Sequence, residues 1–210
     1  MKYKKKLLTL TILAALSLGV TSNLIAQSEP KMGIKGGLNV SNLYLDDVND
    51  ENARFGFNIG LYGQLFSSDV FALQPELLFS TKGSRDEFDG FADETVKFNL
   101  NYLDLPVLAV IKLGESAEIH AGAYASYLLN ANVSYDGDLG NGGEDIDRDN
   151  FKSYDYGLVG GFGLNFGNLQ VGARYNYGLV KIADSDAAEL VLGDAKNSVA
   201  QLYLAVNLKK

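Results

Sequence analysis

The sequence predicts an all-β fold, an eight-stranded antiparallel β-barrel that crosses a membrane, and three observations predict it. Apolar and polar residues alternate in about eight stretches from Met32 onward, which is the period of a β-strand. The apolar faces of these stretches carry no charged residue, and the connections are alternately short and long. Short turns at one end and long loops at the other are typical of bacterial outer-membrane barrels. The short connections are residues 67–69, 114–116 and 167–168, and the long, acidic ones are residues 45–53, 83–93, 134–150 and 181–195.

Residues 1–26 predict a secretory signal peptide, which leaves residues 27–210 as one outer-membrane β-barrel domain. Four early lysines precede a short apolar stretch, and Ala26 fits a cleavage site. An N-terminal anchor helix is the alternative, but a membrane-spanning helix needs about 20 apolar residues. The chain has no Cys, which excludes disulfides, a lipoprotein anchor and thiol catalysis.

The first three strands are expected at residues 32–43, 54–66 and 70–82. Each has one apolar face and one polar face, because successive side chains of a strand point to opposite sides. The polar faces hold Lys35, Asn39 and Ser41; Arg54, Asn58, Tyr62 and Gln64; and Gln74, Glu76, Ser80 and Lys82.

The fourth strand, expected at residues 94–113, breaks this alternation. Leu100 and Asp104 have the same parity, and a carboxylate facing lipid is costly. One extra residue in a β-bulge would reverse the faces of all residues that follow it. We therefore expect a bulge near residues 102–103 of this strand, with Leu100 outside the barrel and Asp104 inside.

The last four strands are expected at residues 117–133, 152–166, 169–180 and 196–208. Their polar faces combine glycine, amide and charged residues, which suits a narrow interior. These faces include Glu118, His120, Tyr124 and Ser126; Asp155, Gly161 and Gly163; Gln170, Gly172, Arg174 and Asn176; and Asn197, Gln201 and Tyr203.

Charge decides which face is outside. A soluble barrel of the lipocalin type is the alternative, and it would be apolar inside with many charges outside. Here the polar faces carry few charges and are rich in glycine and amide residues. Aromatic residues gather near the strand ends, as in the interfacial girdles of membrane barrels. Polar residues are therefore expected inside, where charges must be paired. We predict a structural ion-pair network of Glu76, Asp104 and Arg174, with a proton or ion path as the alternative.

Four segments carry a family resemblance: GIKGGLNVSNL, LQPELLFSTKG, YLDLPVLAVIKLG and DYGLVGGFGLNFGNLQVGARYNYGL. In this order and spacing they resemble the PorT-like family of small outer-membrane barrels. Glu76, Asp104 and Arg174 match its Q-P-E, Y-L-[DE]-[IL]-P and R-Y positions. The resemblance implies an outer-membrane barrel, and a link to assembly of a protein-secretion machinery.

Candidate chemistry is sparse. The only histidine, His120, is expected near the turn between the fourth and fifth strands, as a hydrogen-bonded interior or rim residue rather than a catalytic one. The 134–150 loop is rich in acids, but it lacks the helices and spacing of an EF-hand. Weak cation binding there is one reading and a solvated acidic loop is the other. The residues concerned are Asp136, Asp138, Glu144, Asp145 and Asp147.

These observations predict a non-enzymatic protein of the cell outer membrane with no cofactor and no metal. Its expected role is structural, surface-interacting or secretion-supporting, and a small porin-like channel is the alternative. A lipid-modifying enzyme is less well supported. Expected partners are outer-membrane lipids and lipopolysaccharide, and an envelope or secretion protein. The four acidic loops form one rim, which either engages divalent cations that bridge lipopolysaccharide, engages a basic partner, or only keeps the protein soluble by repulsion. The net charge of −8 argues against nucleic acid, which needs a basic face.

Overall fold

The computed structural model describes residues 31–44, 53–88, 94–137, 142–146, 151–184, 193 and 195–208. The predicted signal peptide lies outside these residues and stays a prediction. Among the residues described, no helix is long and apolar enough to cross a membrane. The strands are β1 (Met32–Tyr44), β2 (Arg54–Gly63), β3 (Phe71–Phe88), β4 (Glu94–Leu113), β5 (Ala117–Gly137), β6 (Gly142–Ile146), β7 (Tyr154–Phe166), β8 (Leu169–Lys181) and β9 (Lys196–Asn207).

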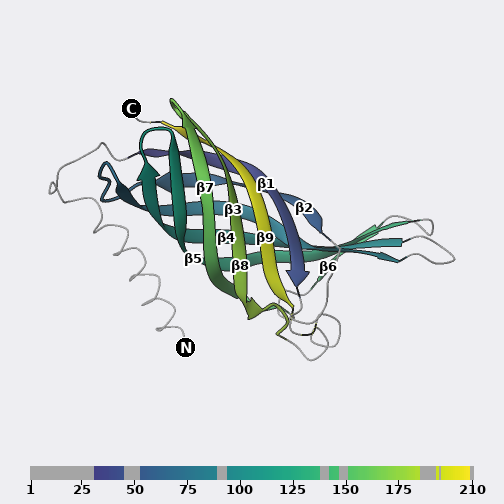
Figure 1. The fold of residues 1–210 in the computed structure, drawn as a ribbon. Helices are drawn as coiled ribbons and strands as arrows, with labels where there is room; N and C mark the ends of the chain where they lie inside the picture. The colour runs from purple at the N-terminus through teal and green to yellow at the C-terminus, as the bar shows by residue number, and fades with distance from the viewer. Residues whose placement is uncertain are drawn as a thin grey trace.

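Eight of these strands close into an antiparallel barrel (Figure 1). The order around the barrel is β1, β2, β3, β4, β5, β7, β8 and β9, and β1 pairs with β9 to close it. Among the strands that the structure describes, β6 lies outside the closed ring and has β5 as its one partner. The predicted eight-stranded antiparallel barrel is therefore confirmed.

The barrel is apolar outside and polar inside. On β2, Phe55 is 76% exposed, whereas Asn58 is 2% exposed. Charged side chains such as Lys35 and Arg174 are 1% and 3% exposed. Large apolar side chains are exposed on the outer surface of every barrel strand, as an outer face in contact with lipid requires. The soluble-barrel alternative is wrong, because it needs the opposite arrangement.

The two ends of the barrel differ. The end with the turns 114–116 and 167–168, called the turn end here, also holds the last residues of β9. At the opposite end, the loop end, β3, β4 and β5 continue beyond their neighbours and β6 joins them. This β extension (residues 83–88, 94–99, 132–137 and 142–146) projects from the barrel in Figure 1.

Two predicted loops are therefore partly strand. β3 runs to Phe88, which pairs with Glu94, so most of the predicted 83–93 loop is a ladder. In the predicted 134–150 loop, residues 134–137 are the end of β5 and residues 142–146 form β6. The acidic composition of these segments indicated loops, but backbone pairing in an extension beyond the barrel needs no apolar face.

The β-bulge lies opposite the expected place, on the neighbouring strand. Asn101 pairs with Asn130 while Tyr102 pairs with Leu128, so Leu129 of β5 is the extra residue. On β4 the alternation continues without a break, and both Leu100 and Asp104 are buried inside. The prediction that Leu100 faces lipid is wrong, because the loop end of the interior is itself apolar.

Candidate functional site

A buried ionic cluster crosses the turn-side half of the barrel interior. Arg174 on β8 donates two hydrogen bonds to Glu76 on β3, from Nη1 to Oε2 over 2.7 Å and from Nη2 to Oε1 over 2.9 Å. Lys35 on β1 donates to Glu76 Oε1 over 3.1 Å. β3 and β8 lie on opposite sides of the eight-stranded ring, so the Glu76–Arg174 pair spans the interior. We call these three residues the central ionic cluster.

Neighbouring side chains complete the polar contacts of this cluster. Gln74 donates a hydrogen bond to Glu76 Oε1 over 2.8 Å. The Tyr203 ring lies 3.6 Å from Lys35 Nζ and 5.4 Å from the Arg174 guanidinium carbon, at cation–π distances. Removing charges from water is expensive, and such paired, bidentate geometry offsets that cost.

A second ionic cluster lies nearer the loop end. Lys82 Nζ lies 2.9 Å from Asp104 Oδ1 and 3.9 Å from Asp155 Oδ2. Ser126 donates to Asp104 over 2.5 Å, and Asn197 donates to Asp155 over 2.9 Å. One cation thus holds carboxylates from β4 and β7, and we call Lys82, Asp104 and Asp155 the loop-side ionic cluster.

A layer of hydrogen-bonded amide side chains, called the amide layer here, lies inside the barrel and joins β1, β2, β3 and β9. Asn39 is its centre: it accepts hydrogen bonds from Asn58 over 2.6 Å and Gln201 over 3.1 Å, and it donates to Ser80 over 3.0 Å. All four side chains are buried. Because each is tied to another strand, the layer fixes how the strands lie against one another.

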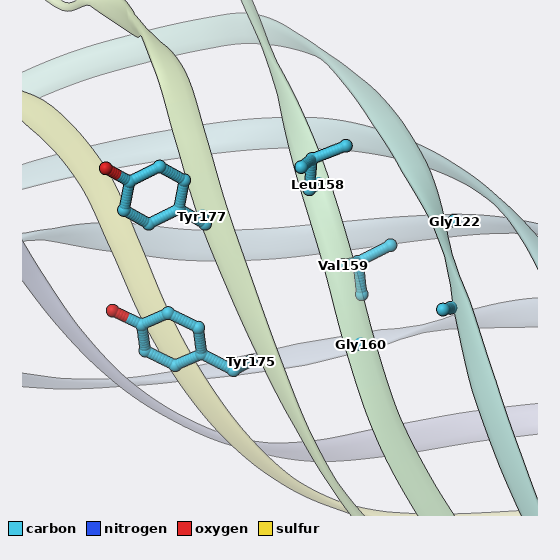
Figure 2. Close-up of a pocket in the computed structure, with 7 residues that line it drawn as sticks. Gly122, Leu158, Val159, Gly160, Tyr175 and Tyr177 are labelled. Carbon is cyan, nitrogen blue, oxygen red and sulfur yellow. The ribbon is translucent and has the colours of Figure 1, made fainter.

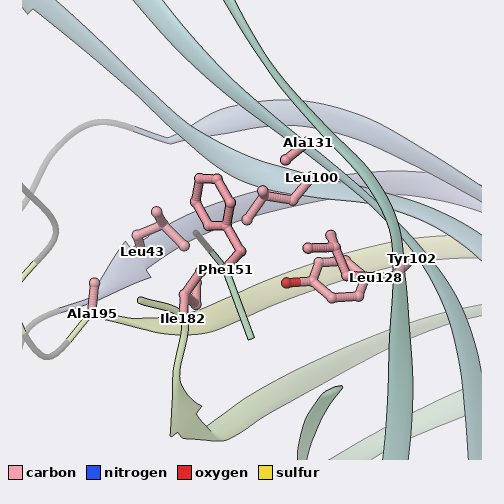
Figure 3. Packing of buried hydrophobic residues seen from close by; sticks show 8 residues of the cluster. All are labelled: Leu43, Leu100, Tyr102, Leu128, Ala131, Phe151, Ile182 and Ala195. Atoms are coloured by element: carbon pink, nitrogen blue, oxygen red, sulfur yellow. The ribbon is translucent and has the colours of Figure 1, made fainter. Parts of the chain in front are cut away.

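An apolar plug occupies the interior at the loop end (Figure 3). Phe151 and Ile182 contribute from segments that connect strands, and Leu100 and Leu128 contribute from β4 and β5. Phe151 is 4% exposed. The plug consists of Leu43, Leu100, Tyr102, Leu128, Ala131, Phe151, Ile182 and Ala195.

The predicted site residues fall into both ionic clusters. The structure brings Glu76 and Arg174 together and places Asp104 with Lys82 instead. Sequence reasoning assigned Lys35, Lys82 and Asp155 to polar faces but not to the network. Their inward parity was the available signal, whereas their partners depend on the register across several strands.

His120 lies inside the barrel and is 1% exposed. Its ring is tilted against Tyr203, with 6.1 Å between the ring centres. Within the described parts of the chain, neither ring nitrogen has a hydrogen-bond partner, in contrast to the hydrogen-bonded histidine that we expected. The adjacent inward residue, Glu118, is equally buried, and neither of its carboxylate oxygens has such a partner there either.

The predicted cation-binding acids are only partly described. The backbone of Asp136 belongs to β5, and those of Glu144 and Asp145 belong to β6. Asp138 and Asp147 lie outside the described residues. Within the described ranges, no three His, Cys, Asp or Glu residues are grouped so as to hold a metal ion.

The outer face has a shallow apolar groove over β5, β7 and β8 (Figure 2). It has a volume of about 420 Å³, and Gly122, Leu158, Gly160, Tyr175 and Tyr177 are among its lining residues. It belongs to the apolar outer surface that faces lipid.

Comparisons with known proteins agree with this architecture. The family model described as "Outer membrane protein beta-barrel domain" matches residues 25–184. None of the curated proteins gives a significant match. The finer resemblance to the PorT-like family stays a prediction.

Several solved structures are similar to this chain. One is Ail, the attachment invasion locus protein of Yersinia pestis, in complex with the heparin analogue sucrose octasulfate; it is 16% identical over 86% of this chain and 100% of that chain, with a TM-score of 0.48. Neisserial surface protein A (NspA) is 13% identical over 86% and 98% of the two chains, with a TM-score of 0.45. OprG from Pseudomonas aeruginosa is 15% identical over 87% and 95%, with a TM-score of 0.39. The residues matched by the family model make up most of the sequence, and this chain belongs to the outer membrane protein beta-barrel domain family of the cell outer membrane.

Proposed function

We propose that this protein is a non-conducting, non-enzymatic anchor in the outer membrane that holds the β extension at the cell surface. The Glu76–Arg174 pair across the interior is the observation that carries the proposal. An ion entering the barrel would meet this pair, the amide layer and the apolar plug in turn. This sequence of barriers argues against the porin-like alternative.

The non-enzymatic part of the proposal is supported by the surroundings of His120. Acid–base or nucleophilic catalysis by a histidine needs a partner within hydrogen-bond distance. Among the described side chains, His120 has none, and it is buried inside the barrel away from lipid.

The β extension supports a role in surface interaction. It is an antiparallel sheet whose outer strands are the end of β3 and the whole of β6. Exposed strand edges present backbone donors and acceptors, and partner proteins bind such edges by adding a strand. The same surface fits an envelope protein or, as the PorT-like resemblance implies, a component of a secretion machinery.

Conductance in a planar bilayer tests the anchor proposal. Purified protein, shown to be folded by a difference in gel migration between boiled and unboiled samples, is added to a bilayer with a known porin as the positive control. We expect the porin to give current steps and this protein to give none. Reproducible steps that disappear when the sample is boiled would overturn the proposal in favour of a channel.

Loss of the β extension tests the surface role. A strain that makes only the protein with a shortened extension should keep the barrel in the outer membrane while losing the contacts that the extension makes. Cross-linking on whole cells from a cysteine introduced at Gly142 should give an adduct with a second envelope protein. The same cysteine at Ser68, at the turn end, is the matched control. Identical adducts from both positions would contradict a role of the extension.

A further inference from the structure

The loop-side ionic cluster contains one more negative charge than positive charge. Lys82 is its cation, whereas Asp104 and Asp155 are both carboxylates, and the three side chains are 0%, 2% and 4% exposed. A charge that is buried without a compensating partner is costly, and such groups in proteins are paired or neutralised. The three side chains of the cluster by themselves leave one carboxylate uncompensated.

Asp155 is the carboxylate that lies farther from the cation. Asp104 Oδ1 lies 2.9 Å from Lys82 Nζ, whereas Asp155 Oδ2 lies 3.9 Å from it. The hydrogen bonds that Asp155 Oδ2 accepts come from two uncharged groups, the Tyr124 hydroxyl over 3.2 Å and the Asn197 amide over 2.9 Å. The surplus negative charge therefore lies mainly on Asp155.

Other contacts hold Lys82 away from Asp155. Its ammonium group donates a hydrogen bond to Asp104 Oδ1 over 2.9 Å. Its Nζ also lies 4.7 Å and 4.9 Å from the ring centres of Tyr102 and Tyr124, at cation–π distances. A move toward Asp155 would give up these contacts, so Lys82 does not serve both carboxylates equally.

Two buried oxygen atoms beside this cluster have no hydrogen-bond partner in the part of the chain that the structure describes. They are Oδ1 of Asp155 and Oδ1 of Asn197. Both belong to one hydrogen-bonded pair, because Asn197 Nδ2 donates to Asp155 Oδ2. Carboxylate and amide oxygens accept hydrogen bonds and do not donate them, so an anion does not fit beside them. A positively charged group would satisfy both oxygens and remove the surplus negative charge.

The strands around Asp155 supply charged or titratable side chains from β3, β4 and β5. Tyrosine is uncharged near neutral pH. From β8 and β9 come Gly178 and Asn197, which carry no charge. The charged or titratable side chains that interact with Asp155 in the described barrel are Lys82, Asp104, Tyr102 and Tyr124.

We propose that the loop-side ionic cluster binds one further monovalent cation beside Asp155, either a proton or an alkali-metal ion. Either would cancel the surplus charge and give the free oxygens of Asp155 and Asn197 a partner. A divalent ion would replace the surplus by a buried charge of the opposite sign, which is equally costly. The site lies in the barrel interior, and the inference does not depend on the anchor function.

The effects of pH and of salt distinguish the two sources of positive charge. An aspartate of the unfolded chain is ionised above about pH 4. If the folded protein keeps a proton that the unfolded chain has lost, the unfolding constant should rise about tenfold for each pH unit between pH 5 and pH 7. If an alkali-metal ion is bound, the unfolding constant should be at least about tenfold lower in sodium chloride than in tetramethylammonium chloride, whose methyl groups keep its charge away from oxygen ligands.

Urea unfolding of the full chain in detergent measures these constants at pH 5 and pH 7 in both salts. Asp155→Asn keeps the shape of the side chain and removes the surplus charge, so this variant should lose the dependence on pH or on the cation. Asp69→Asn is the matched control. Asp69 is exposed in the connection between β2 and β3, and its variant should keep the dependence.

Two results would overturn the proposal. One is equal unfolding constants of the unaltered protein in all four solutions, which is decisive whether or not the Asp155→Asn variant folds. The other is a dependence on pH or on the cation that Asp155→Asn retains in full. A conducting barrel would overturn the proposed anchor function alone, so the two failures can be told apart.

Discussion

At the scale of single residues, the interior depends on charges that have partners on distant strands. Glu76 joins β1, β3 and β8 because it binds both Lys35 and Arg174. Pairing of this kind adds little stability over an apolar interior, but removing one partner leaves a buried charge uncompensated. We therefore expect the interior ion pairs to contribute mainly by favouring one register of the strands over the others.

Replacing Arg174 by alanine should destabilise the barrel strongly. The Glu76 carboxylate would keep Lys35 and Gln74 but lose its bidentate partner, and breaking a buried pair costs about 3–5 kcal/mol. Lys181→Ala is the control; Lys181 ends β8 opposite Lys196, and its loss should cost about 0–1 kcal/mol. Urea unfolding of both variants in detergent measures the difference. Equal midpoints would contradict the buried Glu76–Arg174 pair.

Replacing Lys82 by methionine should leave two buried carboxylates close together. Asp104 and Asp155 share this one cation within the loop-side ionic cluster, so the expected loss of stability is also about 3–5 kcal/mol. Adding Asp104→Asn removes one of the two charges, and the double variant should recover a measurable part of the loss. If the two substitutions are additive in urea unfolding, Lys82 and Asp104 are not coupled.

The sequence allowed these residues to be assigned to the interior but not paired. Alternation along the third strand places Lys82 inside, and the cost of a carboxylate facing lipid places Asp104 inside. Which inward residues meet depends on strand tilt and on the register of β3 with β4, which no local pattern records. The sequence predicted that Glu76 and Arg174 belong to the same ion-pair network, and the structure pairs them. It did not predict that Asp104 would pair with Lys82 in a separate cluster.

At the scale of elements, the strands were predictable where one face meets lipid. The fourth strand has the predicted bounds, from Glu94 to Leu113. The rule that apolar residues face outward fails at the loop end, because the plug is apolar and lies inside. This failure led to the bulge being assigned to the wrong strand, since Leu100 fills the plug. The sequence did not predict the β extension for a related reason. Strands outside the membrane need no apolar face, so their sequence shows no alternation of apolar and polar residues.

Shortening the β extension should leave the barrel intact. Arg85 and Lys97 are direct partners, so replacing residues 86–96 by Asn-Gly closes the β3–β4 hairpin with a two-residue turn. The ladder between residues 71–82 and 100–111 stays in place, and it carries the barrel. Unboiled and boiled samples of the variant should migrate differently, as we expect for the unaltered protein. Loss of this difference in the variant alone would show that the extension is needed for folding.

At the scale of the whole molecule, the orientation in the membrane is the property on which the surface role depends. If the chain is exported as predicted, β1 begins on the periplasmic side of the membrane. Because the number of barrel strands is even, β9 ends on the same side. We therefore expect the loop end to face the cell exterior and the turn end to face the periplasm.

Epitope insertion tests this orientation. A tag between residues 140 and 141, which connect β5 and β6, should be labelled on intact cells. A tag after Ser68, in the short connection between β2 and β3, should be labelled only after the outer membrane is permeabilised. The reverse pattern would mean that the barrel is inverted, and the proposed surface function would then fail.

The pairing of β1 with β9 sets the order of events during assembly. Gly33 and Asn207 are neighbours in the closed barrel, although almost the whole chain separates them. No backbone pairing can seal the barrel until β9 has been synthesised and exported. Before that moment, the alternating apolar faces of seven strands are in water with an open edge on each side, which is the state most prone to aggregation. We therefore expect that a nearly complete chain needs shielding in the periplasm, and that a chain terminated before Lys196 is degraded there rather than inserted.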